Sequence, residues 1–301
     1  MVRVVCCQLA PLIGDLPANR RASAAAVRNA VGLGADVVVL PELVTSGYVF
    51  ASVDEARTVA VGTGHPVFSD WADAVAGTGS IVVGGFCELG DDGHLYNSAA
   101  VVDAGGVRLV YRKTHLWDRE KLIFRPGSAP PPVIDTAAGR LGVLICYDME
   151  FPEMTRTLAL GGADLVAVPT NWPLVARPEG ERPPEVVAAM AAARANRMFV
   201  ACCDRSGRER GQDWTEGTAV VDASGWVVAT AGPGGLAVAD LDLGRARDKR
   251  LSERNDALAD RRPELYAGPP GTGTGTGTAP SPDHTSWVRP PVHPSDQTTG
   301  T

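Results

Sequence analysis

The sequence has no long run of basic residues. Its 301 residues include 28 Lys and Arg against 35 Asp and Glu, which gives a formal net charge of -7 at pH 7. Proteins that bind nucleic acid concentrate positive charge along one face or one helix. The sequence therefore predicts a protein that does not bind nucleic acid, and the acidic balance favours solubility without selecting a partner.

Long hydrophobic segments are also missing. A membrane-spanning helix needs roughly 18 or more consecutive apolar residues, and no stretch approaches that length. The N-terminal sequence MVRVVCCQLAPLIGD has one early Arg and an apolar run that ends before Gln8, which is too short for a signal peptide. These features predict a cytoplasmic protein without a membrane partner.

Cysteine and histidine residues lack the spacing of metal and redox motifs. The six cysteines form no Cys-x-x-Cys pair, and the five histidines show no metal-ligand spacing, so no metal site is expected. Cysteines within apolar runs are typically buried thiols in a reducing compartment. We expect this of five of them, and Cys146 differs because of its position. The five are Cys6, Cys7, Cys87, Cys202 and Cys203.

Apolar segments of strand length alternate with helical segments, and the second half of the chain repeats the order of the first. This alternation predicts two sheets whose outer faces are covered by helices, a four-layer α/β sandwich of the αββα type. Strands are expected at residues 3–7, 35–40, 81–87, 95–103, 108–112, 141–146, 165–169, 199–203, 218–222, 227–230 and 236–240, and helices at 19–31, 66–76, 152–160, 185–196 and 244–253.

The composition changes at Gly268. Gly-Thr repeats followed by Pro, Ser and His leave almost no apolar residues, and such a segment cannot bury enough surface to become ordered. The sequence therefore predicts one folded domain at residues 1–267 and a disordered, dispensable tail at 268–301.

Three chemically reactive side chains stand at the ends of apolar runs. Glu42 follows VVVLP, Lys113 follows LVYR, and Cys146 follows LGVLI. Strand ends are where α/β proteins collect active-site groups, because the rigid strands fix them there.

Each of these side chains has a functional and a structural interpretation. Cys146 is either a nucleophile, with the N–H of Tyr147 as an oxyanion donor, or a buried structural thiol. Lys113 would stabilise a thiolate and an oxyanion, or is simply solvated. Glu42 would be a partly buried general base, or a charge emerging into solvent. Glu120 is a second acid candidate, although it stands in a charged run of the kind that is usually solvated.

Together these segments resemble the nitrilase superfamily of carbon–nitrogen hydrolases. The resemblance extends from residue 1 to about residue 267 and matches in both order and spacing. The matching pieces are Pro41-Glu42-Leu43 with Gly47-Tyr48, the segment YRKTHL that contains Lys113, the segment CYDMEFPE that begins at Cys146, Asn196-Arg197, Asn255-Asp256, and the segment DRRP that begins at Asp260.

The resemblance implies a role for each candidate. Cys146 would be the nucleophile, Glu42 the general base, and Lys113 the group that stabilises the tetrahedral intermediate together with the N–H of Tyr147. Glu120 would orient Lys113 or the substrate. The family has the αββα sandwich fold, is usually dimeric, and needs no metal or organic cofactor, so we expect a homodimer or higher homo-oligomer.

The residues after the cysteine favour the small-molecule amidase branch. Tyr147-Asp148-Met149 stands where nitrilases usually carry Trp-Glu-Asn, and Met149-Glu150 stands where carbamoylases usually carry two arginines. This branch includes aliphatic amidases, an R-selective amidase and 5-aminopentanamidase, and related enzymes hydrolyse 4-guanidinobutanamide. The expected reaction converts a small primary amide to an acid and ammonia. A nitrilase, an N-carbamoyl hydrolase, an acyltransferase and a catalytically silent binding protein are the alternatives.

Six side chains are expected to bind the substrate, some because they follow Cys146 in the sequence and others because they would form further walls of the same pocket. They are Tyr48, Tyr147, Asp148, Glu150, Asn171 and Trp172. One hypothesis is that Asp148 or Glu150 makes the pocket negative and favours an amide with a distal amino or guanidino group. The alternative is that Asp148 caps the following turn and Glu150 belongs to the N-terminus of the helix.

Overall fold

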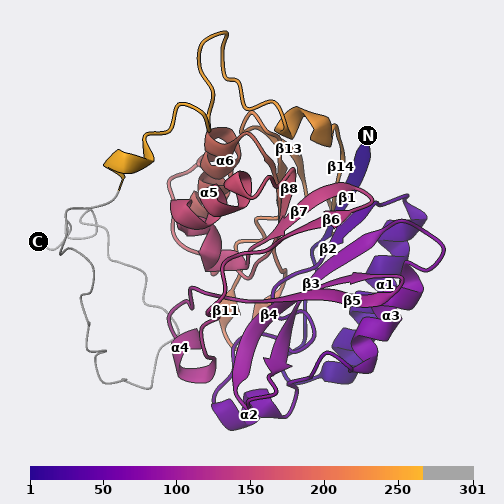
Figure 1. The fold of residues 1–301 in the computed structure, drawn as a ribbon. Coiled ribbons are helices and arrows are strands. Elements are labelled where there is room, and N and C mark those ends of the chain that lie inside the picture. Colours follow the sequence, from indigo (N-terminus) through magenta and orange to yellow (C-terminus); the bar gives the residue numbers. More distant parts are fainter. Residues whose placement is uncertain (267–301) are drawn as a thin grey trace, which may run out of the picture.

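Two six-stranded sheets pack face to face in the computed structural model (Figure 1). The structure describes residues 1–266. The predicted tail at 268–301 therefore lies outside the described residues.

The first sheet has a parallel centre and antiparallel edges. Strands β1 to β3 pair in parallel, while β14 pairs antiparallel with β1, and β4 and β5 extend the other side as antiparallel strands. The order is β14 (Leu236–Leu241), β1 (Val2–Cys7), β2 (Val37–Val39), β3 (Ile81–Leu89), β4 (Leu95–Asp103), β5 (Gly106–Arg112).

The second sheet repeats this plan. Strands β7, β8 and β9 are parallel, and β6, β12 and β13 are added antiparallel at the two sides. The order is β13 (Val227–Thr230), β12 (Ala219–Val221), β9 (Phe199–Cys203), β8 (Leu165–Pro169), β7 (Gly139–Val143), β6 (Val133–Thr136). A separate hairpin joins β10 (Arg208–Glu209) to β11 (Gln212–Asp213).

Helices cover the outer face of each sheet. Helices α1 (Leu16–Gly32) and α3 (Pro66–Ala74) pack on the first sheet, and α5 (Pro152–Leu160) and α6 (Pro184–Asn196) pack on the second, on the opposite side of the molecule in Figure 1. Parallel strands buried on both faces need such cover, and their near-continuous apolar sequences reflect it. The predicted αββα sandwich is confirmed.

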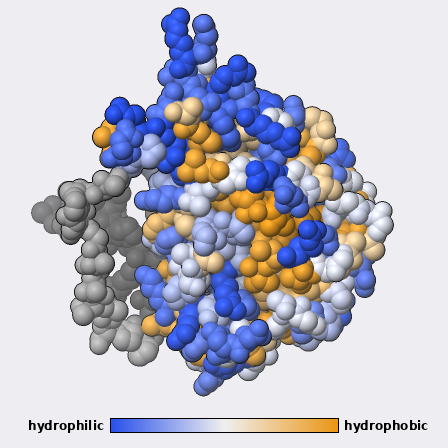
Figure 2. Space-filling view, in the orientation of Figure 1, coloured by the Kyte–Doolittle hydropathy of each residue, from blue (hydrophilic) through white to orange (hydrophobic). Residues whose placement is uncertain are grey.

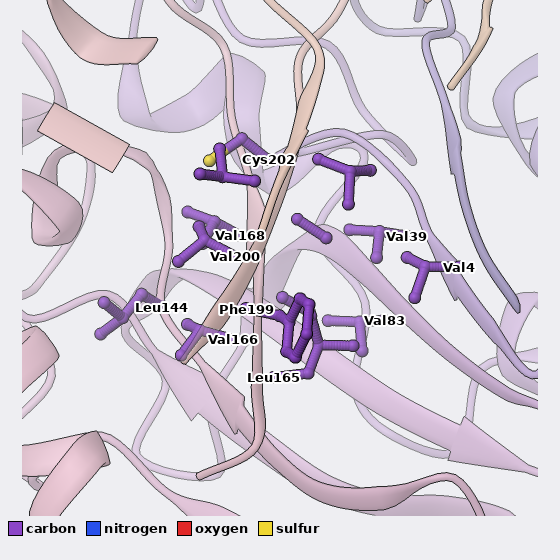
Figure 3. Close-up of a cluster of buried hydrophobic side chains, with 14 of the residues drawn as sticks. Val4, Val39, Val83, Leu144, Leu165, Val166, Val168, Phe199, Val200 and Cys202 are labelled. Atoms are coloured by element: carbon purple, nitrogen blue, oxygen red, sulfur yellow. The ribbon is translucent and has the colours of Figure 1, made fainter. Parts of the chain in front are cut away.

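The core between the sheets is built from fully buried aliphatic side chains. Figure 3 shows Val4, Val39 and Val83 of the first sheet on one side, and Phe199 and Leu165 of the second sheet beside Val83. These five residues are at most 3% exposed. Most of these side chains are small and β-branched, which suits a close approach of two sheets.

Two expectations about local structure are wrong. The helix expected at 244–253 is only a 3-10 turn, η2 (Leu243–Ala246), capped where the Asp242 carboxylate accepts from Gly244 N. The residues that follow carry no apolar stripe that a helix could bury. The strand expected at 141–146 ends at Val143, so Cys146 lies beyond the sheet.

Several short elements had no counterpart in the sequence prediction. These are strand β6, the hairpin β10–β11, and helices α2 (Val53–Arg57) and α4 (Glu120–Ile123). Runs of two to five residues carry too little periodicity to be recognised. Within residues 1–266, no helix has the length and apolar character needed to cross a membrane.

The packing of the two sheets can be tested at Phe199. The change Phe199→Ala removes an aromatic ring from the core and is expected to lower the free energy of unfolding by about 3–5 kcal/mol. The control Val228→Ala alters a side chain that is 48% exposed. This control is expected to change the free energy of unfolding by about 0.5 kcal/mol or less. Urea unfolding measures both, and equal effects would contradict a tightly packed core at Phe199.

Candidate active site

A buried lysine lies between two buried carboxylates at the centre of the site. Lys113 directly follows β5, Glu42 lies three residues after β2, and Glu120 begins α4. Lys113 Nζ lies 2.7 Å from Glu42 Oε1 and 2.8 Å from Glu120 Oε1. All three side chains are at most 4% exposed, so none is the solvated charge of the alternative interpretation.

Glu42 is held through its backbone and one of its two carboxylate oxygens. Oε1 accepts from Asn97 Nδ2 at 2.7 Å as well as from Lys113, and Asn171 Nδ2 donates to the backbone oxygen of Glu42 at 2.9 Å. Within residues 1–266, Oε2 has no hydrogen-bond partner. Burial raises the pKa of Glu42 to about 7, and Lys113 opposes that rise. The site therefore contains a carboxylate that can take up a proton near neutral pH.

Cys146 begins a 3-10 turn, η1 (Cys146–Glu150), and adopts the left-handed conformation with φ of 46°. Its side chain is buried among the same groups. Burial raises the pKa of the Cys146 thiol, and repulsion from the Glu42 carboxylate adds to the rise, while Lys113 and the N–H of Asn171 act in the opposite direction. The resting sulfur is therefore a thiol that needs a base before it can act as a nucleophile.

Asp148 holds the cysteine turn against the segment that carries the lysine. Its buried carboxylate accepts from the N–H of Ile145 at 3.3 Å, the hydroxyl of Tyr111 at 2.9 Å and the N–H of His115 at 2.9 Å, and it lies 2.9 Å from Nδ1 of His115. These internal contacts match the capping alternative. Both carboxylate oxygens of Asp148 are bonded within the protein, and its expected contact with the substrate stays a prediction.

Glu150 is exposed and lines a different cavity. That cavity, of about 730 Å³, lies along α5 and α6, and its lining includes Met149, Glu153 and Ala192 but none of the lysine or cysteine site. Although the residue is exposed, partial desolvation of its carboxylate and repulsion from Glu185 raise the pKa of Glu150. This cavity does not coincide with the buried reactive groups.

Tyr48 connects the lysine site to a second, much smaller cavity. Its hydroxyl donates to Glu120 Oε1 at 2.5 Å, and its ring is 5% exposed. The cavity beside it has a volume of about 10 Å³. It is lined by Tyr48, Trp117, Asp118, Arg119, Pro173, Gln212 and Trp214.

The remaining expected substrate-binding residues lie around the cysteine. Asn171 and Trp172 are 1% and 2% exposed and directly follow β8 and Thr170. The half-buried ring of Tyr147 makes edge contacts with Trp117 at 4.9 Å and with Phe151 at 5.0 Å between ring centroids. Tyr48 thus contacts Glu120 and Asn171 contacts Glu42, and Trp172 follows Asn171 in the chain.

Two supporting residues were not found from the sequence. Asn97 interrupts the apolar strand β4, and Asp204 follows β9 directly. The buried Asp204 carboxylate accepts from the N–H of Trp172 at 2.9 Å and from the hydroxyl of Thr170 at 3.2 Å, which fixes the residues on both sides of Asn171. Its position after a strand is the same signal that marked Glu42 and Lys113, so the pattern could have found it.

No group of three or more His, Cys, Asp or Glu side chains within residues 1–266 is arranged to hold a metal ion.

Comparison with known proteins identifies the family. Residues 3–251 match the carbon–nitrogen hydrolase family model. The chain belongs to the carbon–nitrogen hydrolase family. It is 35% identical to a nitrilase from Pyrococcus abyssi over 88% of this chain and 99% of that protein. It is also 35% identical to an (R)-stereoselective amidase from Pseudomonas sp over 85% of this chain and 89% of that protein.

The fold of this hydrolase matches solved amidase structures. An amidase from Nesterenkonia sp. superposes with a TM-score of 0.72 at 29% identity, covering 88% of this chain and 95% of that structure. The family, its relatives and its structural neighbours show a hydrolase of the amidase branch that acts on carbon–nitrogen bonds.

The backbone of Glu42 depends on a glycine in the neighbouring strand. A Cβ atom on Gly85 of β3 would lie 2.5 Å from Glu42 Cα and closer still to Leu43 N. The change Gly85→Ala is therefore expected to displace Glu42 and to lower the free energy of unfolding by about 1–3 kcal/mol. At Gly62 a Cβ atom would meet nothing within 4 Å, so Gly62→Ala is the control. Thermal melting reports the loss of stability, and the rate of Cys146 alkylation by iodoacetamide reports the displacement of Glu42. Identical results for the two variants would contradict the tight contact.

Proposed function

We propose that this hydrolase cleaves small primary amides through a thioester on Cys146. The observation that carries the proposal is the contact of Lys113 with both Glu42 and Glu120 in a buried site beside the Cys146 thiol. The three groups provide a nucleophile, a base with a pKa raised to about 7, and a cation for the developing oxyanion.

The first half of the reaction forms the thioester. Glu42 takes the thiol proton of Cys146, Oε2 being the oxygen without a hydrogen-bond partner in residues 1–266, and the sulfur attacks the amide carbon. Two of the three ammonium protons of Lys113 bind Glu42 and Glu120, which leaves the third for the oxyanion. Backbone N–H groups near Cys146, from Tyr147 or Asn171, assist. Glu42 then gives its proton to the leaving nitrogen, and ammonia departs.

The second half hydrolyses the thioester. Water enters the place of the ammonia, Glu42 removes one of its protons, and the resulting tetrahedral species expels the sulfur of Cys146. The sulfur regains its proton from Glu42, and the carboxylic acid leaves. The sum of both halves is one amide and one water converted to one acid and one ammonia.

The open space beside Tyr48 is very small, and neither Cys146 nor Lys113 lines it. The cavity there measures about 10 Å³, which is close to the room that a single water needs. Solved structures of the Nesterenkonia amidase contain acrylamide, butyramide, and the acetamide moiety of fluoroacetamide attached to the active-site cysteine. These ligands support a small aliphatic amide as the substrate class of this chain as well.

A distal amino or guanidino group on the substrate would meet a different carboxylate from those expected. Asp148 is bonded within the protein and Glu150 lines the α5–α6 cavity, whereas Asp118 lines the small cavity beside Tyr48. If the substrate carries a distal cation, we therefore propose that Asp118 binds it.

Ammonia release from a panel of amides tests the proposed activity. The panel contains propionamide, 5-aminopentanamide, 4-guanidinobutanamide, one nitrile and one N-carbamoyl amino acid. We expect release from amides, and a loss of at least about 10³-fold in Cys146→Ala, because the nucleophile is removed. Release from the nitrile or the carbamoyl compound alone would contradict the amidase proposal.

The same panel tests Asp118. The change Asp118→Asn is expected to weaken hydrolysis of the two cationic amides relative to propionamide, while Glu150→Gln is the matched control. An unchanged ratio in Asp118→Asn would rule out Asp118 as the group that binds a distal cation.

The pH profile tests the role of Glu42. A general base works only when ionised, and burial places the pKa of Glu42 at about 7. We therefore expect kcat/KM to fall about tenfold per pH unit below about pH 7 and to level off above it. The measurement is a kcat/KM profile at constant ionic strength on the best amide. A flat profile from pH 5 to pH 8 would contradict the assignment.

Other members of the family keep two alternatives in view. Relatives include the Pyrococcus abyssi nitrilase and an N-carbamoylputrescine amidase from Arabidopsis thaliana that is 30% identical over 84% of this chain. The acrylamide, butyramide and fluoroacetamide-derived ligands of the Nesterenkonia amidase favour a short amide over a carbamoylated polyamine.

We also propose a homodimer that buries the α5–α6 face. Leu160 and Val187 on these helices are 52% and 48% exposed, and Figure 2 shows hydrophobic residues among the hydrophilic ones near these helices. Sedimentation velocity of the full chain, compared with Val187→Glu, tests this assembly, and a monomeric wild type would overturn it. The cytoplasmic location stays a prediction that fractionation of the native cell would test.

A further inference from the structure

A buried ion pair lies outside the reacting groups. Arg205 and Glu209 are 1% and 4% exposed, and Arg205 Nη1 donates to Glu209 Oε2 at 2.8 Å. Removing both charges from water is costly, so a buried pair by itself is weak evidence for stability. The other contacts of the two side chains indicate what the pair does.

The second carboxylate oxygen of Glu209 holds the backbone at Tyr48. Oε1 accepts from the N–H of Tyr48 at 2.9 Å and from the N–H of Val49 at 2.6 Å. The preceding residue, Gly47, has φ of 78°, and a Cβ atom there would lie 2.8 Å from Glu209 Oε2 and 2.5 Å from Ile13 Cα. The turn before Tyr48 is thus fitted closely around the Glu209 carboxylate.

Arg205 supports the ring of Tyr48 indirectly, through Trp214. Its guanidinium carbon lies 4.5 Å above the ring of Trp214, and that ring makes an edge contact with the ring of Tyr48 at 5.5 Å. Nη2 of Arg205 donates to the backbone oxygen of Pro11 at 3.0 Å, which fixes the guanidinium. Tyr48 is therefore held by Glu209 through its backbone and by Arg205 through Trp214.

Tyr48 is linked to Lys113 through Glu120. Its hydroxyl donates to Glu120 Oε1, the same oxygen that accepts from Lys113 Nζ at 2.8 Å. We propose that Arg205 and Glu209 form a positioning pair that fixes Tyr48 and, through it, Glu120 and Lys113. The proposal rests on the proposed function only for its kinetic consequence, since the contacts exist independently of the substrate.

The expected consequence is a loss of turnover that goes beyond any loss of stability. A displacement of about 1 Å at a catalytic group costs about 100-fold in rate. The change Glu209→Gln retains an oxygen for the two backbone N–H groups and removes the charge that holds Arg205. We expect kcat to fall about 10- to 100-fold, with a smaller change in KM.

The test is a double-mutant cycle between Glu209→Gln and Tyr48→Phe. Tyr48→Phe removes the hydroxyl that reaches Glu120, so in that background Glu209→Gln should lower kcat by less than about threefold. Asp213→Asn on the same hairpin is the control, because Asp213 is exposed and pairs with Arg208, which is also exposed. It should leave kcat unchanged.

A second readout needs no substrate. The rate at which iodoacetamide alkylates Cys146 depends on the Lys113 and Glu42 environment, and it should fall in Glu209→Gln and show the same coupling to Tyr48→Phe. If no amide is hydrolysed, the proposed function fails and the alkylation cycle still decides on the positioning pair.

The outcomes separate positioning from a purely structural role. Coupled effects of the two substitutions on kcat and on alkylation support the proposal, including where the unpaired Arg205 lowers the melting temperature. Independent, multiplying effects, or a lower melting temperature with unchanged alkylation, overturn it. If Glu209→Gln does not fold, Arg205→Lys keeps the buried charge while removing the planar contact with Trp214, and the same cycle with Tyr48→Phe is measured.

Discussion

The interaction on which the site depends is a lysine buried between two carboxylates. Lys113 is fully buried, and its Nζ contacts one carboxylate oxygen of Glu42 and one of Glu120. Burying charges costs several kcal/mol per ion unless each is paired and hydrogen-bonded. Two carboxylates and one ammonium leave an excess of negative charge, and the burial that raises the pKa of Glu42 to about 7 allows one proton to be held near neutral pH. Burial, with repulsion from the two carboxylates, raises the pKa of the neighbouring Cys146 thiol, so the thiol stays protonated until Glu42 accepts its proton.

The two-sheet architecture makes this cluster possible. Glu42 and Lys113 come from the ends of strands in the first sheet, whereas Cys146 and Asn171 follow strands of the second. Face-to-face packing brings these ends together, and each sheet is stiffened by its parallel centre and its covering helices. The core of small aliphatic side chains in Figure 3 therefore also sets the separation of the reacting groups.

Buried polar contacts fix the segments that follow the strands and carry the site residues. Asp148 joins the cysteine turn to His115 and Tyr111, beside the lysine, and Asp204 fixes the residues that flank Asn171. Satisfied buried polar groups of this kind give a single arrangement, because any displacement leaves a donor or an acceptor without its partner. Rigid support of this kind is what a site needs when its geometry must be held to fractions of an ångström.

The sequence by itself determined the fold class, the order of most strands and helices, and the candidates Glu42, Lys113, Cys146 and Glu120. Apolar runs of strand length end where polar chemistry begins, and that signal is local. The sequence could not decide whether the carboxylates of Asp148 and Glu150 cap a turn or helix or face the substrate, since an acid at either position suits both roles equally well. It also missed Arg205 and Glu209, whose partners lie about 160 to 190 residues away along the chain. Only the tertiary structure shows which groups these side chains contact, because contacts between residues far apart in sequence exist only after the two sheets have packed.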